Sequence, residues 1–106
     1  MATGRLGTAD LAAATNTTVY TCPADTFAVV TVSVCNRGSG SATVQLAICD
    51  TSTPGVDEYL EFDITLLAKG VLERTGIVLD AGKLLVVRSS AISVNAIVYG
   101  IETATV

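Results

Sequence analysis

The densest group of side chains that could carry out chemistry is a run of four carboxylates, Asp57, Glu58, Glu61 and Asp63. Carboxylates at such short spacing can bind a calcium ion or act as a general acid and base. A calcium loop, however, places its ligands on a tight turn in an Asp-x-Asp-x-Asp-Gly pattern, whereas these residues follow one another along an expected strand. We therefore interpret them as a solvated strand face.

Histidine is absent, and the three cysteines are Cys22, Cys35 and Cys49. The commonest general base and metal ligand is therefore missing, together with every Ser-His or Cys-His nucleophile. The cysteines are 13 and 14 residues apart without a Cys-x-x-Cys pair, which disfavours zinc. Only Arg37 lies close enough in sequence to activate a thiolate, and it falls on an expected loop. We predict small, semi-buried thiols, no catalytic residue, no metal, no cofactor and no enzymatic activity.

Charge and glycine content exclude two further classes of site. The six Lys and Arg residues are scattered and the net charge is −4, which argues against nucleic-acid binding. Gly38 and Gly40 belong to neither a dinucleotide-binding nor a phosphate-binding loop motif. No apolar run reaches the roughly 18–20 residues of a membrane helix, so no membrane partner is expected. Tyr59 with Glu61 and Asp63 is the one candidate pocket for carbohydrate or peptide.

These residues belong to a chain of 106 residues, which is the size of one domain. Abundant Val and Thr, with turn residues every 8–12 positions or so, predict an all-β fold: an antiparallel β-sandwich or jelly-roll-like domain over residues 17–106, preceded by an N-terminal arm over residues 1–16. The sequence is compatible with either an extended arm or a short helical turn. The seven predicted strands are Thr17–Cys22, Phe27–Asn36, Ala42–Asp50, Glu58–Leu67, Val71–Leu79, Lys83–Ser89 and Ser93–Glu102.

The second and third predicted strands alternate apolar and polar residues. If they pair as a hairpin around the loop 37–41, Val34 lies opposite Val44 and Val32 opposite Leu46. The two strands could equally lie in different sheets. In the next strand the alternation places two sets of side chains on opposite faces: Leu60, Phe62 and Ile64 against Asp57, Tyr59, Glu61 and Asp63.

Two later segments, residues 84–87 and 97–101, are apolar on both faces. A strand of this kind is covered on both sides, and a two-layer sandwich of this size has little to cover the second face. The mean hydropathy of +0.59 also exceeds what one small core can absorb. We therefore predict a homo-oligomer, with a subunit interface that includes Leu6, Leu11, Leu85, Val87, Ile97, Tyr99 and Ile101.

Four segments carry a resemblance to a known group of proteins: Thr17–Ala24, Val30–Arg37, Gly70–Gly82 and Val98–Glu102. The pattern of a tyrosine, a short turn with proline, a long strand and Asn-Arg resembles small β-sandwich virion proteins of tailed bacteriophages, of the cyanophage and marine-phage type. The Ala-Gly before Leu-x-Val at Ala81–Val86 is similar as well. The resemblance implies a virion structural protein and a trimer, and it carries over no catalytic or ligand residue.

Taken together, the expected function is a capsid decoration (cement) protein that binds and stabilises the assembled shell. Its partners would be further copies of itself and the major capsid protein. A tail, collar, baseplate or fibre-attachment component, bound to a tail protein, is the alternative, and a carbohydrate- or peptide-binding module is the alternative from another class. Because Met1–Asp10 lacks an apolar signal-peptide core, we expect the protein to assemble into the virion in the bacterial host cytoplasm. Deleting residues 2–14 is expected to weaken shell binding and leave the fold intact.

Overall fold

The chain is all-β in a computed structural model that describes residues 2–105. The seven predicted strands are confirmed, each within two residues of its expected ends, and an eighth precedes them. Val, Ile, Leu and Thr dominate them because branched side chains fit the pleated surface. The strands are β1 (Thr3–Leu11), β2 (Thr17–Thr21), β3 (Thr26–Asn36), β4 (Ala42–Cys49), β5 (Tyr59–Leu66), β6 (Val71–Leu79), β7 (Leu84–Ser89) and β8 (Val94–Ala104).

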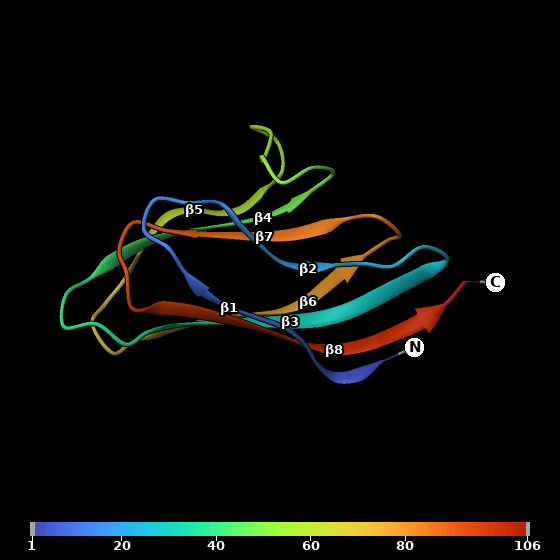
Figure 1. The fold of residues 1–106 in the computed structure, drawn as a ribbon, viewed down its shortest axis with the longest axis horizontal. Helices are drawn as coiled ribbons and strands as arrows, with labels where there is room; N and C mark the ends of the chain where they lie inside the picture. The colour runs from blue at the N-terminus through green and yellow to red at the C-terminus, as the bar shows by residue number, and fades with distance from the viewer. Residues whose placement is uncertain (1, 106) are drawn as a thin grey trace.

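The eight strands form two four-stranded antiparallel sheets that pack face to face (Figure 1). Sheet A has the order β1-β8-β3-β6 and sheet B the order β2-β7-β4-β5. Only β4 and β5 are neighbours both in sequence and in a sheet, and every other connection crosses between the sheets. This is the strand order of an eight-stranded jelly roll, so the predicted β-sandwich is confirmed.

The predicted hairpin between the second and third expected strands is wrong, because β3 lies in sheet A and β4 in sheet B. Alternation shows which side of a strand faces the core, and both strands do bury their apolar side there. Residues 37–41 therefore connect the two layers. The buried side chain of Asn36 fixes this crossing: its amide donates to the carbonyl oxygens of Gly40 (2.9 Å) and Leu66 (3.1 Å), and its oxygen accepts from the N–H of Gly38 (2.9 Å).

The predicted N-terminal arm is also corrected, because residues 3–11 are the edge strand β1 of sheet A. It pairs with β8 from Thr3 opposite Ile101 to Leu11 opposite Val94, and Leu11 is 2% exposed in the core. Gly7 allows β1 to pass close to the other sheet, since a Cβ at this position would lie 2.2 Å from the carbonyl oxygen of Val19. The boundary at residue 16 consequently separates no arm from the sandwich.

Strand β5 departs from the predicted alternation because its pairing with β4 shifts twice. Val44 pairs with Ile64, but Leu46 pairs with Glu61, so the strand bulges between them. Asp63 in this bulge has a positive φ of 52°. The bulge turns Phe62 outward, away from Leu60 and Ile64, and leaves it 59% exposed. The prediction that Phe62 shares one face of the strand with Leu60 and Ile64 is therefore wrong.

Two polar contacts join the sheets at opposite edges of the sandwich. At one edge, the hydroxyl of Tyr20 on β2 donates to Glu102 on β8 at 2.5 Å. At the other, the guanidinium of Arg74 on β6 pairs with Glu61 on β5 at 2.5 Å. The inward turn of Glu61 follows from the bulge in β5, because Glu61 pairs with the core-facing Leu46. Each contact connects a strand of one sheet to a strand of the other.

Candidate functional site

Four of the residues predicted for the subunit interface lie inside this chain instead. Leu11, Leu85 and Val87 are 2%, 0% and 0% exposed and belong to the core between the sheets. Leu6 is half-buried and packs against the same core. These four positions are corrected: their apolar side chains pack in or against the core of the sandwich, and Leu11, Leu85 and Val87 are not on the surface for a partner to bind.

The second apolar face of β7 is covered by the chain itself. Val86 points away from the main core, yet it is only 2% exposed because it packs with Ala47 and Cys49 of β4. Tyr59 and Leu84 pack against this small cluster. The connection between β4 and β5 stands above the same side of sheet B in Figure 1. The inference that β7 needs a partner subunit to cover it is therefore wrong.

The other three predicted interface residues lie on the outer face of sheet A. Ile97 is half-buried, Tyr99 is 40% exposed and Ile101 is 49% exposed on β8. Val29 of β3 lies between Ile101 and Val78 of β6, and it pairs with both. We call the set of outward apolar side chains here the sheet A face; it comprises Phe27, Val29, Val78, Ile97, Tyr99 and Ile101.

The side chains of the sheet A face are uncharged, and the charged residues Arg5, which pairs with Tyr99 across β1 and β8, and Glu73 lie beside them. The hydroxyl of Tyr99 donates to Glu73 at 3.0 Å, and this hydrogen bond raises the pKa of the tyrosine. At one margin of the sheet, Arg37 pairs with Asp10 at 2.7 Å. A band of partly exposed aliphatic and aromatic side chains with polar groups around it is the usual composition of a protein-binding surface.

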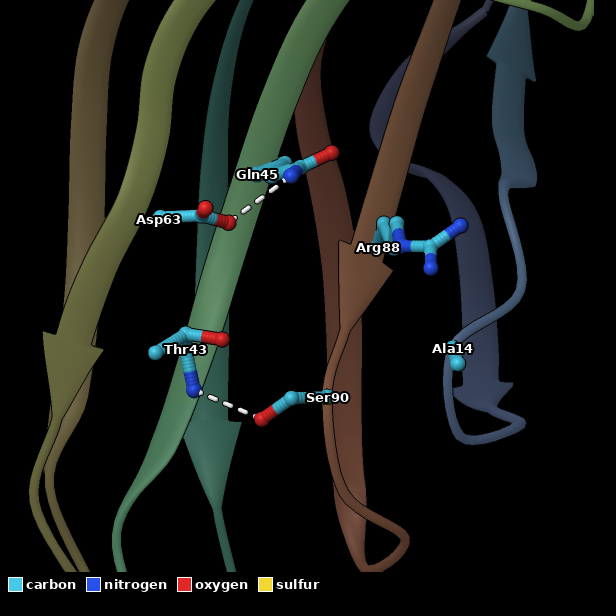
Figure 2. A pocket seen from close by; sticks show the side chains of 6 residues that line it. All are labelled: Ala14, Thr43, Gln45, Asp63, Arg88 and Ser90. Atoms are coloured by element: carbon cyan, nitrogen blue, oxygen red, sulfur yellow. Dashed lines mark hydrogen bonds between the residues drawn. The ribbon is translucent and has the colours of Figure 1, made fainter.

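The outer face of sheet B carries a contrasting feature, an open polar pocket of about 250 Å³ (Figure 2). Gln45 of β4 donates to Asp63 of β5 at 2.7 Å. On the other side of Gln45, its register partner Arg88 rises from β7. The pocket is lined by Ala14, Thr43, Gln45, Asp63, Arg88 and Ser90.

Local backbone geometry sets the shape of this pocket. Ala14 has a positive φ of 54° and Asp63 one of 52°, a region that side-chain-bearing residues rarely adopt. The N–H of Ala14 donates to the carbonyl of Ser89 at 2.8 Å, which fixes that wall to the end of β7. The N–H of Thr43 donates to the hydroxyl of Ser90 at 2.9 Å. Sequence analysis missed the pocket because its residues come from four separate segments, and the one detectable signal was the polar Gln45 in an apolar strand.

The candidate carbohydrate or peptide pocket of Tyr59, Glu61 and Asp63 is not formed. Tyr59 packs on the second cluster and against Phe62, with ring centroids 4.8 Å apart. Glu61 turns to Arg74 at the edge of the sandwich, and Asp63 faces the polar pocket. The bulges in β5 separate the three side chains, so this prediction is wrong.

The cysteines are unpaired, and two of them are deeply buried. Cys22 and Cys49 are 1% and 0% exposed, and burial raises the pKa of both thiols. A raised pKa keeps a thiol protonated at neutral pH and suppresses its nucleophilicity. Within residues 2–105, no three His, Cys, Asp or Glu side chains come together as metal ligands.

No helix long and apolar enough to span a membrane occurs among the described residues. No protein-family model, curated protein or solved structure matched the chain when it was compared with them. The functional argument therefore begins from the class that the fold and surfaces define: a small jelly-roll domain with one apolar outer face and one polar pocket.

Proposed function

We propose that this protein is a structural component of a bacteriophage particle, a decoration protein that binds the assembled capsid shell through its sheet A face. The observation that carries the proposal is the cross-strand row of Ile101, Val29 and Val78 with Tyr99 beside it, on the outside of a sheet whose inner side already fills the core. Burying such a row against a partner removes apolar area from water at about 25 cal/mol per Å². The bacteriophage assignment itself rests on the resemblance of the sequence.

The sheet A face is supported from below by the hydrophobic core, and such a rigid surface suits a decoration protein that binds a preformed shell. The strands of sheet A that carry the row are paired along their length, so the face needs little ordering when it binds. A protein that binds the assembled shell and not the free capsid subunit stabilises the shell by mass action. No bond is made or broken in this mechanism, in keeping with the proposal that the protein is no enzyme.

Copy number tests the position on the particle. Quantitative mass spectrometry of purified particles should give one copy per capsid subunit, or a simple fraction such as one third. A count of a few to a few dozen copies would move the proposal to the tail, collar or baseplate. Absence from the particles would overturn it.

Single substitutions test the surface. Ile101→Glu places a charge in the centre of the sheet A face and should abolish binding to capsids that lack this protein. Thr65→Glu adds the same charge on the exposed outer side of sheet B and is the matched control. Equal binding by both variants would overturn the role of the sheet A face.

Self-association is the second part of the proposal. We propose a trimer, so light scattering of the purified chain should give three times the monomer mass of 10.8 kDa. A monomer at all concentrations would mean that the shell alone covers the sheet A face.

A further inference from the structure

The polar pocket on sheet B has no part in the proposed shell contact, because it lies on the opposite outer face of the sandwich. Arg88 is the residue of this pocket that most clearly indicates which ligand it could bind. Among residues 2–105, Arg37 and Lys83 form ion pairs, whereas Arg5 and Arg88 have neither an ion pair nor a hydrogen bond. Arg5 is exposed on the outer side of sheet A, and Arg88 differs from it in being half-buried and lining a pocket. A half-buried guanidinium with five donors is thus left available inside a pocket.

The pocket presents three kinds of hydrogen-bonding group in one row across sheet B. Asp63 offers a carboxylate, Gln45 an amide and Arg88 a guanidinium, each on a neighbouring strand. Because strands lie about 4.8 Å apart, the row extends roughly 10 Å between the strands at its ends. Figure 2 shows Gln45 between the other two, with its amide nitrogen directed to Asp63.

This arrangement matches a ligand that carries a carboxylate at one end and hydroxyl groups at the other. We propose that the pocket binds an acidic sugar, a uronic acid residue, with the sugar carboxylate on Arg88 and its hydroxyls on Asp63 and Gln45. Arg pairs with carboxylates through two parallel hydrogen bonds. Asp63 accepts from Gln45 through Oδ1 only, so Oδ2 can accept from a sugar hydroxyl. Gln45 can in turn accept through its side-chain oxygen.

Other ligand classes leave part of the row unmatched. A neutral sugar would place no acceptor with full charge on Arg88. A phosphate group or a nucleic-acid backbone favours clustered cations, whereas this row has one cation and one carboxylate, on a chain of net charge −4. A simple anion such as acetate would pair with Arg88 and leave Asp63 without a donor from the ligand.

The walls of the pocket are formed before any ligand binds. Ala14 and Asp63, on opposite sides of it, both hold left-handed backbone conformations that cost of order 1–2 kcal/mol each in residues with a side chain. Ala14 is held by its bond to Ser89, and Asp63 is directed into the pocket by the bulge in β5. These two local conformations fix the positions of the pocket walls.

Titration of the isotope-labelled protein with D-glucuronate, followed by NMR chemical shifts, tests the site. We expect saturable shifts at the residues of the pocket, at least tenfold weaker binding of methyl β-D-glucoside, and weaker binding of acetate. Arg88→Gln should weaken glucuronate binding by about tenfold or more, as expected for loss of a charge-assisted pair. Arg5→Gln is the matched control: it removes the same charge from an exposed position on the outer side of β1 in sheet A.

Three outcomes would overturn the inference: no saturable shifts, equal effects of the two arginine substitutions, or acetate binding as tightly as glucuronate. Asp63→Asn is an independent test, since it should weaken the binding of glucuronate and leave the binding of acetate unchanged. Thermal unfolding of each variant confirms that the fold persists. The titration uses the free protein, so its result does not depend on whether the protein binds a capsid.

Discussion

The hydrogen bond between Tyr20 and Glu102 is the clearest test of how the two sheets are held together. Tyr20 is 7% exposed, and its hydroxyl donates to Glu102 Oε2 at 2.5 Å, across the edge where β2 of sheet B meets β8 of sheet A. The other carboxylate oxygen, Oε1, accepts from the N–H of Ala2 at 3.2 Å. Glu102 therefore connects both sheets and the start of the chain.

Replacing Tyr20 with Phe removes the hydroxyl and keeps the ring in the core. Hydrogen bonds to charged groups contribute about 1.5–3 kcal/mol. Water can partly replace the lost donor because Glu102 is only half-buried, which favours the lower half of that range. We expect the free energy of unfolding at pH 7 to fall by about 2 kcal/mol, with a melting temperature lower by roughly 10 °C.

Urea unfolding followed by circular dichroism measures this change. Tyr59→Phe is the matched control, because among the described residues the Tyr59 side chain makes a ring contact and no hydrogen bond. The control should change stability by less than about 0.5 kcal/mol. A loss from Tyr20→Phe no greater than the control's would refute the view that this bond holds the edge of the sandwich.

The same bond predicts how stability changes in alkali. Burial and then the hydrogen bond to Glu102 raise the pKa of Tyr20 well above its ordinary value near 10. The unfolded chain therefore loses this proton at lower pH than the folded chain does. The contribution of Tyr20 is complete below about pH 10 and declines as pH rises beyond it. Wild type should lose stability more steeply than Tyr20→Phe between about pH 10 and 12, and parallel curves would contradict the assignment.

Three further predictions concern backbone and thiols. Gly100→Ala would place a Cβ 2.1 Å from a carbonyl oxygen of β3, so we expect a loss of about 3 kcal/mol or more by thermal unfolding, whereas Gly40→Ala, which meets open space, should be nearly neutral. The structure reverses the expectation that deleting residues 2–14 leaves the fold intact: the deletion removes β1 and exposes the edge of β8, so the product should be unfolded by circular dichroism, and a folded product would show that β1 is dispensable. In native buffer a thiol reagent should modify Cys35 first, because the other two cysteines are at most 1% exposed, and equal rates for all three would contradict this burial.

Strand positions could be predicted from the sequence because they depend on local signals. Turn residues such as those at 80–82 end each apolar run, and the alternation within β3 identifies its buried side. Sheet membership could not be predicted in this way. β3 and β4 both direct their apolar sides into one core, so the same pattern fits a hairpin or a crossing between sheets. The buried side chain of Asn36 hydrogen-bonds two backbone groups of the crossing, at Gly38 and Gly40, and the carbonyl of Leu66 at the end of β5.

The misplaced residues share a physical cause, namely local irregularity that composition does not reveal. The first segment, predicted as an N-terminal arm, contains Gly4 and Gly7, and these glycines permit the bulged pairing and close approach of β1. The bulges in β5 sent Phe62 outward and Glu61 inward, against a simple alternation of period two. The same bulge directs Asp63 into the polar pocket. Because the bulge could not be predicted from the sequence, neither could the pocket.

Apolar content alone overestimated the interface, because the apolar outer faces of β7 and β8 are covered to different extents. β7 buries Val86 in the second cluster of the same chain, whereas β8 leaves Tyr99 and Ile101 partly in water on a sheet that no other layer formed by residues 2–105 covers. What distinguishes the strands is their sheet: the long β4–β5 connection stands over sheet B only. That asymmetry gives the two outer faces different chemistry. Because the two surfaces lie on opposite sheets, a partner bound to the sheet A face would leave the pocket around Arg88 open to solvent. The proposed shell contact and the proposed ligand could therefore bind in either order.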